Sequence, residues 1–259
     1  MSQKKKNFVF IILFFIAVLS LGFILLDWLP LISKYKLQIS YKYSYSFKVI
    51  VVLLTTLLVF ISGNDCLSKR DLKEMKRIFI LVLLADSALV GFQTPVIGIL
   101  FFSFVQLCLV FRNSKGMREV IKSDGNFKLR RSLFINTILV TTLFILNLVR
   151  IMDNHMENKL LLLIMVLYGF MVSLSLWTAM ANYLLKLFPK TNSIMVALGM
   201  CFFALCDINV GLSLILPEGL IRTISSDLVW IFYAPALTLL ALSGYKYKNT
   251  ENQSNSSFL

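Results

Sequence analysis

The chain has 259 residues, of which 58% are hydrophobic and 13% aromatic, and it carries a formal net charge of +13 at pH 7. With its positive mean hydropathy, this composition excludes an ordinary water-soluble domain and indicates an integral membrane protein. The basic residues lie between apolar runs, where they orient helices against anionic headgroups, so the charge does not indicate nucleic-acid binding.

Eight apolar runs are long enough to cross a bilayer, which takes about 17–25 residues in a helix. The first follows the sequence MSQKKK and is expected to remain as an anchor, because no small-residue cleavage site closes it. The runs predict an all-α fold, a single membrane domain over residues 1–259 with a polar tail at 250–259. The eight transmembrane helices are expected near 8–26, 47–62, 78–93, 95–111, 133–151, 160–185, 193–216 and 228–245.

The distribution of basic residues predicts the orientation of these spans. Most of the 26 Lys and Arg residues share one side of the membrane if the N-terminus is cytoplasmic. The segment from Arg112 to Arg131 is the most basic of these, and its charge is expected from topology alone. We therefore expect a multi-pass protein of the cell membrane with both termini cytoplasmic. Its short loops and Lys-rich composition favour a bacterial inner membrane.

Two of the 13 acidic residues lie inside apolar runs, Asp86 in the third span and Asp207 in the seventh, while the other eleven are assigned to connecting segments or tails. A charge at the centre of a membrane helix costs about 3 kcal/mol on insertion scales, so these residues indicate a functional site. Both spans run from inside to outside, and the two carboxyl groups are expected at a similar depth, in one polar cavity. Because such groups repel each other in a low dielectric, one is expected to be neutral, which places an acid beside a base.

The alternative for the two Asp residues is purely structural, since each can hydrogen-bond a neighbouring helix for about 0.6 kcal/mol on average. A neutral Ser or Asn would do this at lower insertion cost, which favours a functional role. Further polar side chains in the apolar runs are expected to bind substrate, although membrane amides equally often join helices. These predicted substrate-binding residues are Gln106, Asn147, Tyr168, Asn209 and Tyr233.

The sequence contains few residues that could form a metal site or a catalytic triad. His155 is the single histidine and falls in a short polar connection, and the four cysteines show no paired metal spacing. We therefore expect no metal, no cofactor and no Ser-His-Asp site. The chemistry must use carboxylates or amides.

The spacing around the two acids resembles the YhhN-type lysoplasmalogenase-like family of eight-span membrane proteins. In that family an Asp in the third span is followed, after a short turn, by Gly-x7-His in the fourth. Here Asp86 is followed by GILFFSFVQ, in which Gly98 matches and Gln106 occupies the His position. The family's Gly-x7-Asp in the seventh span is matched by GMCFFALCD, from Gly199 to Asp207.

The last span of the family carries a Tyr followed four residues later by Gln; this chain has Tyr233 but Leu237. The resemblance covers the span order and loop lengths, and hence most of the chain. It implies a hydrolase that acts on the vinyl-ether bond of a lysoplasmalogen and releases a fatty aldehyde and a glycerophospho-alcohol. Asp86 and Asp207 would share the roles of acid and base, in an order left open.

The implied partner is a lysophospholipid or another amphiphilic lipid, which would enter sideways from the bilayer. A second hypothesis is a non-enzymatic lipid or small-molecule binding or transport protein, in which the same Asp pair is a protonation switch. Cavity shape separates the two: a closed pocket with a lateral lipid opening favours the hydrolase, while two opposed vestibules favour transport.

Overall fold

A computed structural model describes residues 2–33, 38–92, 94–123, 127–153 and 159–247. These residues form helices and their connections, with no strand beyond an isolated antiparallel bridge between Cys66 and Tyr245. His155 and the polar tail at 250–259 lie outside them. The helices are α1 (Gln3–Ser33), α2 (Gln38–Ser62), η1 (Gly63–Asp65), α3 (Lys69–Asp86), η2 (Ser87–Gly91), α4 (Pro95–Asn113), α5 (Met117–Ser123), α6 (Phe127–Asp153), α7 (Lys159–Leu185), α8 (Lys190–Ile215) and α9 (Leu220–Leu242).

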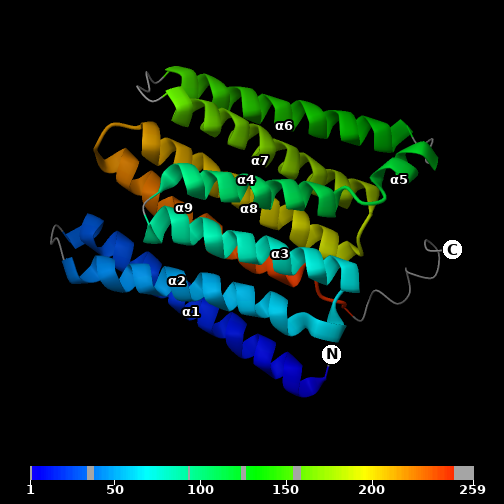
Figure 1. Ribbon diagram of the computed structural model, residues 1–259, viewed down its shortest axis with the longest axis horizontal. Helices are drawn as coiled ribbons and strands as arrows, with labels where there is room; N and C mark the ends of the chain where they lie inside the picture. Colours follow the sequence, from blue (N-terminus) through cyan, green and yellow to red (C-terminus); the bar gives the residue numbers. More distant parts are fainter. Residues whose placement is uncertain (1, 34–37, 93, 124–126, 154–158, 248–259) are drawn as a thin grey trace.

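The long helices form one bundle (Figure 1). α1 and α2 lie at one edge and α6 and α7 at the other, with α3, α4, α8 and α9 between them. The closest packing joins α8 to α9, because Gly199 has no side chain: a Cβ atom there would lie 3.1 Å from Cγ of Leu240 and 3.4 Å from the carbonyl oxygen of Ala236. This glycine lies eight residues before Asp207 and fixes the helix that carries it.

Seven helices of the described residues are long and apolar enough to cross a membrane. The chain is therefore a multi-pass membrane protein. α3 is not among the seven, because its first half, KRDLKEMKR, is highly charged. The eighth span predicted at 78–93 is thus not confirmed, although its residues do form the apolar end of α3 and the π-helical turn η2.

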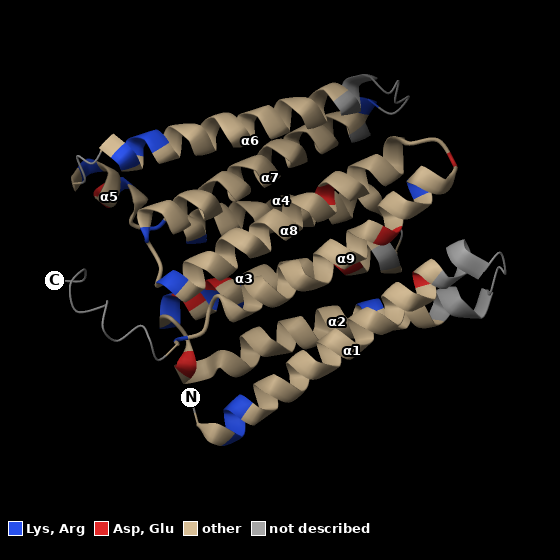
Figure 2. Cartoon of the chain, turned by 180° about the vertical axis from the view of Figure 1, so that it is seen from behind, with Lys and Arg blue, Asp and Glu red and all other residues tan. Residues whose placement is uncertain are grey.

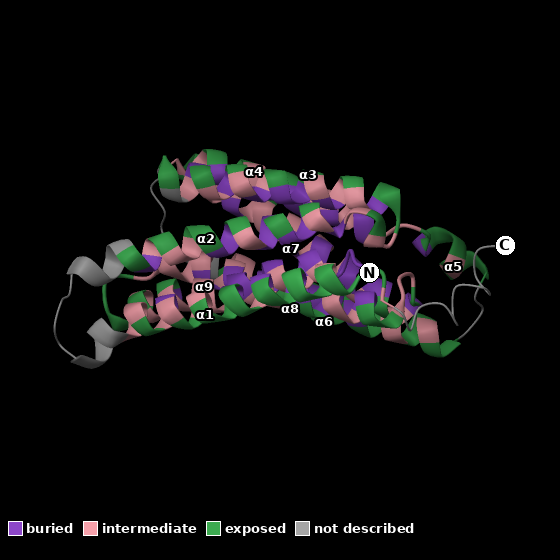
Figure 3. Cartoon of the chain, turned by 90° about the horizontal axis from the view of Figure 1, so that it is seen from below, coloured by how far each residue is buried: buried purple, intermediate pink, exposed green. Residues whose placement is uncertain are grey.

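Burial separates the two sides of the helices (Figure 3). Phe79, Val82 and Met200 are buried between helices, whereas Phe10 and Phe134 are exposed on the outside of the bundle. An apolar outer surface with a packed interior is the arrangement that suits a lipid environment.

The N-terminal segment and the residues after α9 meet at the same end of the bundle. The Lys5 ammonium lies 2.6 Å from the Asp65 carboxylate, and the backbone N–H of Lys246 donates to the carbonyl oxygen of Asp65 over 2.8 Å. Lys and Arg gather at this end (Figure 2). Its orientation toward the cytoplasm stays a prediction.

The same end contains a buried ion pair that the sequence-based assignment placed in connecting segments. Arg112 belongs to α4 and is completely buried, and Asp71 belongs to α3 and is 5% exposed. The guanidinium donates to the two carboxylate oxygens over 2.7 and 3.2 Å, and to the hydroxyl of Ser243 over 3.0 Å. It also lies 5.1 Å from the ring centre of Phe188. The assignment of Arg112 to a basic loop is wrong: its side chain joins α3, α4 and α9.

Candidate functional site

Each of the two predicted carboxylates is hydrogen-bonded to a predicted tyrosine. The Tyr233 hydroxyl on α9 donates to Asp86 Oδ2 over 2.8 Å. The Tyr168 hydroxyl on α7 donates to Asp207 Oδ1 over 2.9 Å. The structure therefore brings these four residues together as two tyrosine–aspartate pairs.

Asp86 is the last residue of α3 and is followed directly by the π-helical turn η2. In this turn the Ser87 hydroxyl donates to the carbonyl oxygen of Leu83 over 2.7 Å. The turn fits against α4 at Gly98, where a Cβ atom would lie 2.3 Å from Cγ of Leu89. π-Helical turns are rare and occur frequently at functional sites, and this one directs the end of α3 toward α9.

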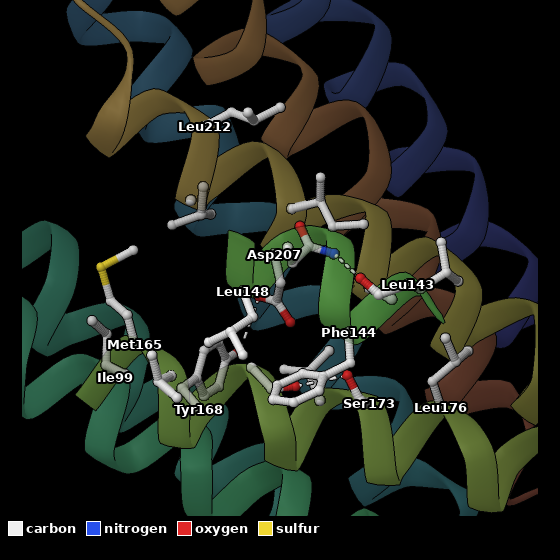
Figure 4. A pocket seen from close by; sticks show the side chains of 18 of the residues that line it. Ile99, Leu143, Phe144, Leu148, Met165, Tyr168, Ser173, Leu176, Asp207 and Leu212 are labelled. Atoms are coloured by element: carbon white, nitrogen blue, oxygen red, sulfur yellow. Dashed lines mark hydrogen bonds between the residues drawn. The ribbon is translucent and has the colours of Figure 1, made fainter. Parts of the chain in front are cut away.

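Asp207 lines a cavity of about 120 Å³ between α6, α7 and α8, named here the Asp207 cavity. In Figure 4 its carboxylate points toward Tyr168 among the side chains of Phe144 and Leu148. The rim reaches the outer surface of the bundle, since Leu143 and Leu214 line it and are 38% and 43% exposed. Its polar lining residues are Asn147, Tyr168, Ser173 and Asp207, and all others are apolar or glycine.

Asp86 lines a different cavity of about 320 Å³, named here the Asp86 cavity, which lies between the first half of α2 and the end of α3. Trp230 of α9 closes one side of it and packs edge-on against Tyr233, with ring centres 5.5 Å apart. Sequence reasoning missed Trp230, although its spacing of three residues from Tyr233 places both on one face of α9. The remaining lining residues are Tyr45, Val49, Val52, Leu53, Leu83, Ser87, Gly91 and Phe92.

The single polar cavity expected from the sequence is therefore divided into two. Phe102 and Phe203 pack edge-on against each other and against Tyr233, with ring centres 5.8–6.2 Å apart. Phe203 lies one turn before Asp207, so this aromatic cluster occupies the layer between the two cavities.

The three predicted amides have different surroundings. Gln106 is completely buried, and its amide interacts with the Tyr168 hydroxyl but makes no hydrogen bond of standard geometry among the described residues. Asn147 lines the Asp207 cavity while its Nδ2 donates to the carbonyl oxygen of Leu143 over 2.8 Å. Asn209 makes the same bond within its own helix, to Leu205, and lines neither cavity. Gln106 and Asn147 thus lie at the site, and Asn209 lies beside it.

Comparison with known proteins gives one match. A sequence model of the YhhN family matches residues 43–244. A search of curated proteins and a search of solved structures found no match. The matched segment includes both tyrosine–aspartate pairs and every described residue that lines the two cavities.

Proposed function

This chain belongs to the YhhN family, and from that premise we propose that it is a membrane-embedded hydrolase of lysoplasmalogen-like ether lysophospholipids. The observation that carries the proposal is the Tyr168–Asp207 pair at the wall of an apolar cavity. A carboxyl group held there by a neutral donor can exchange a proton with a substrate that arrives from the lipid phase.

The apolar lining of the Asp207 cavity suits the chain of a single-tailed lipid. Leu143 and Leu214 lie at its rim and face outward, so a lipid can enter between α6 and α8 without leaving the bilayer. α6 packs mainly on α7, which leaves its side toward α8 available for such access. The vinyl-ether bond, at the head of the chain, would then lie near the Asp207 carboxyl.

The reaction consumes one water and requires three proton transfers. A neutral Asp207 carboxyl donates its proton to the β-carbon of the vinyl ether, and the positive charge is then shared between the α-carbon and the ether oxygen. The carboxylate left behind stabilises this oxocarbenium ion. Water adds to the α-carbon and gives up a proton to form a hemiacetal. When the hemiacetal hydroxyl loses its proton and the glycerol oxygen gains one, the bond between that oxygen and the carbon breaks, which releases a fatty aldehyde and a glycerophospho-alcohol.

Both cavities have exposed apolar residues in their lining, such as Leu214 in one and Leu53 in the other. We assign proton delivery to Asp207, because apolar side chains from three long helices surround it and suit the chain of a lipid. Asp86 lines the other cavity, on the far side of the aromatic cluster. It would accept the proton of the attacking water. For Asp86 to act on the same bond as Asp207, Phe102 and Phe203 must shift apart, because these rings pack between the two tyrosine–aspartate pairs.

The test is release of free aldehyde from a panel of vinyl-ether, alkyl-ether and ester lysophospholipids by the purified protein in detergent. Vinyl-ether substrates should be cleaved, and Asp86→Asn and Asp207→Asn should each abolish release. In D₂O, acid catalysis should place one deuterium on the carbon next to the aldehyde, and mass spectrometry of the trapped aldehyde detects it. Unchanged turnover in either variant, or aldehyde without deuterium, would contradict the mechanism.

Transport is the other function that an intramembrane Asp pair supports. Both cavities, however, lie in the half of the bundle away from the N-terminus, lined by the end of α3, the end of α8 and the first half of α2. The opposite half is filled at its end by the buried Arg112–Asp71 pair. This arrangement favours the hydrolase. Folded protein that releases no aldehyde from any lipid in the panel would favour binding or transport instead.

A further inference from the structure

A column of buried polar side chains runs along the contact between α4 and α7, which lie side by side (Figure 1). Tyr168, Ser175 and Asn182 follow one another at intervals of seven residues in α7, and Gln106 and Asn113 have the same spacing in α4. Side chains seven residues apart lie on nearly the same face of a helix. Ser175, Asn182, Gln106 and Asn113 are completely buried. These five residues are named here the polar column.

One end of the polar column is at the Asp207 carboxyl group. The Tyr168 hydroxyl donates to Asp207 Oδ1 over 2.9 Å, and it also interacts with the Gln106 amide. Tyr168 lines the Asp207 cavity, whereas Gln106 is not part of the lining and lies in the interior of the bundle. The column therefore approaches Asp207 from the protein interior and not from the lipid side.

The rest of the polar column leads toward the charged end of the bundle. The Ser175 hydroxyl lies 3.7 Å from the sulfur of Met200 in α8, and Asn182 Nδ2 donates to the carbonyl oxygen of Asn113 over 2.9 Å. From Tyr168 to Asn182 the helix rises about 21 Å at 1.5 Å per residue. This length is about two thirds of the hydrocarbon core of a bilayer, which is roughly 30 Å thick.

The polar column contains more hydrogen-bonding atoms than partners for them. Both amide atoms of Gln106 and of Asn113, Oδ1 of Asn182 and Oδ2 of Asp207 are buried and make no hydrogen bond of standard geometry among the described residues. A buried polar atom without a partner costs about 1–3 kcal/mol, and buried water typically bonds to such atoms. Helix association explains the bond from Asn182 to α4, but it does not explain the atoms that remain unpaired. The column therefore has the chemistry of a binding site for a chain of water molecules.

The far end of the polar column lies close to the aqueous boundary. Asn113 is the last residue of α4, and Ser114 and Lys115 after it are partly exposed. Arg112 is completely buried next to Asn113, but its guanidinium lies 2.7 Å from the Asp71 carboxylate, which balances its charge. This neighbouring charge therefore presents little repulsion to a proton that enters the column.

The proposed reaction creates a need for such a path. Asp207 gives its proton to the substrate in each cycle, while the proton of the attacking water goes to Asp86 on the far side of the aromatic cluster. Asp207 must therefore recover a proton from another source before the next cycle. Its own cavity is lined mostly by apolar side chains, and such a lining does not conduct protons.

We propose that the polar column is a water-filled path that carries protons from the charged end of the bundle to Asp207. The inference rests on the proposed function, because it takes Asp207 to be the group that loses a proton. In the last step a water bound at Gln106 gives a proton to the Tyr168 oxygen, while the Tyr168 hydroxyl gives its own proton to the Asp207 carboxylate. The tyrosine thus ends the step neutral. Each water is reprotonated by the next one along the column, and the first by solvent.

The experiment measures proton access to Asp207 without turnover. The purified protein is placed in lipid nanodiscs, and the buffer is changed from H₂O to D₂O. Infrared spectroscopy follows the C=O band of the protonated Asp207 carboxyl group, which is identified by its loss in Asp207→Asn. Asn182→Leu places an apolar side chain of similar size in the column, so deuterium exchange at Asp207 should be about tenfold slower than in the wild-type chain, equivalent to about 1.4 kcal/mol in the barrier.

The matched control is Asn136→Leu. Asn136 is also buried, and its Nδ2 donates to the carbonyl oxygen of Trp177, so this variant loses the same kind of interhelical bond outside the polar column. It should exchange like the wild-type chain. Asn182→Ser keeps a polar group and room for water and should also exchange rapidly. Ser175→Val closes the middle of the column, and it replaces Asn182→Leu if the latter does not elute as folded protein in gel filtration.

Exchange at the wild-type rate in both Asn182→Leu and Ser175→Val would overturn the proposal, as would equal slowing in Asn136→Leu. The aldehyde assay is separate from this measurement. Aldehyde release with unchanged exchange in the column variants would reject the proton path alone. Slowed exchange in a chain that releases no aldehyde from any lipid would reject the hydrolase alone.

Discussion

Gly98 of α4 lies so close to Leu89 in the π-helical turn after Asp86 that a Cβ atom at position 98 would be 2.3 Å from Cγ of Leu89 and 3.2 Å from its backbone nitrogen. A side chain at residue 98 would therefore force Leu89, and with it the turn that follows Asp86, to move. Gly98 is also the first residue of the Gly-x7-Gln segment in the fourth span. Its close packing against Leu89 explains why a glycine occupies this position.

Gly98→Ala should consequently destabilise the protein, since a methylene forced into a packed core costs about 1–3 kcal/mol. Thermal unfolding in detergent should show a lower Tm, and Leu89→Ala in the same chain should restore it. Gly211→Ala is the control: a Cβ atom there has no neighbour within 4 Å, and Ala is favoured over Gly in a helix by up to about 1 kcal/mol. An unchanged Tm in Gly98→Ala would show that the turn adapts without cost.

Tyr168→Phe removes the hydroxyl that donates to Asp207 and keeps the ring that lines the cavity. A hydrogen bond to a charged or ionisable group is worth about 1.5–3 kcal/mol, so kcat for aldehyde release should fall roughly ten- to hundredfold with KM little changed. Tyr183→Phe is the matched control on the same helix, because that side chain is 44% exposed. Equal kcat values in the two variants would remove Tyr168 from the mechanism.

The sequence was sufficient to find the helices and the two carboxylates, for physical reasons. A long apolar run has few structures open to it in lipid other than a helix, and Asp86 and Asp207 stand out because an acid in such a run is costly. The helix ends differ from the predicted spans because polar residues continue the helices: α1 begins at Gln3 and α2 at Gln38, ahead of the predicted runs.

The division of the site into two cavities was beyond sequence reasoning. It depends on how α3 and α8 are rotated about their own axes, and hence on contacts such as those of Gly98 and Gly199 with residues far away in the sequence. The Arg112–Asp71 pair was missed for a related reason. Each residue lies in a charged stretch near a helix end. Only the packing of α3 against α4, which brings together two residues 41 positions apart in sequence, shows that both are buried.

Arg112→Met should be strongly destabilising, because it leaves the Asp71 carboxylate buried without its main partner, a change that typically costs about 3–5 kcal/mol. Arg112→Lys should restore little, since an ammonium cannot replace the two parallel bonds of the guanidinium. The double variant Arg112→Met with Asp71→Leu should recover most of the lost Tm, because neither charge is then left alone.

Arg70→Met provides the comparison for this buried pair. It removes a cation next to Asp71 in sequence, but its side chain is 82% exposed and faces Glu74 at 3.7 Å. Exposed pairs of this kind contribute about 0–1 kcal/mol, so its Tm should stay near that of the wild-type chain. If Arg112→Met behaved like Arg70→Met, the buried pair would not be what holds this end of the bundle together.

Gly211 tests whether the Asp207 cavity holds the lipid chain. It lines that cavity, and no atom lies within 4 Å of where its Cβ would be. Gly211→Leu should therefore fold normally and fill part of the cavity, so that kcat/KM for a long-chain vinyl-ether lysolipid falls about tenfold, equivalent to about 1.4 kcal/mol of transition-state stabilisation. A substrate with a shorter chain should recover much of the loss, because the added side chain competes with the end of the lipid and not with its headgroup.

Gly219→Leu is the control, because it adds the same side chain at an exposed position that lines neither cavity. It should leave the dependence of kcat/KM on chain length unchanged. If the two variants showed the same dependence on chain length, the lipid chain would bind elsewhere.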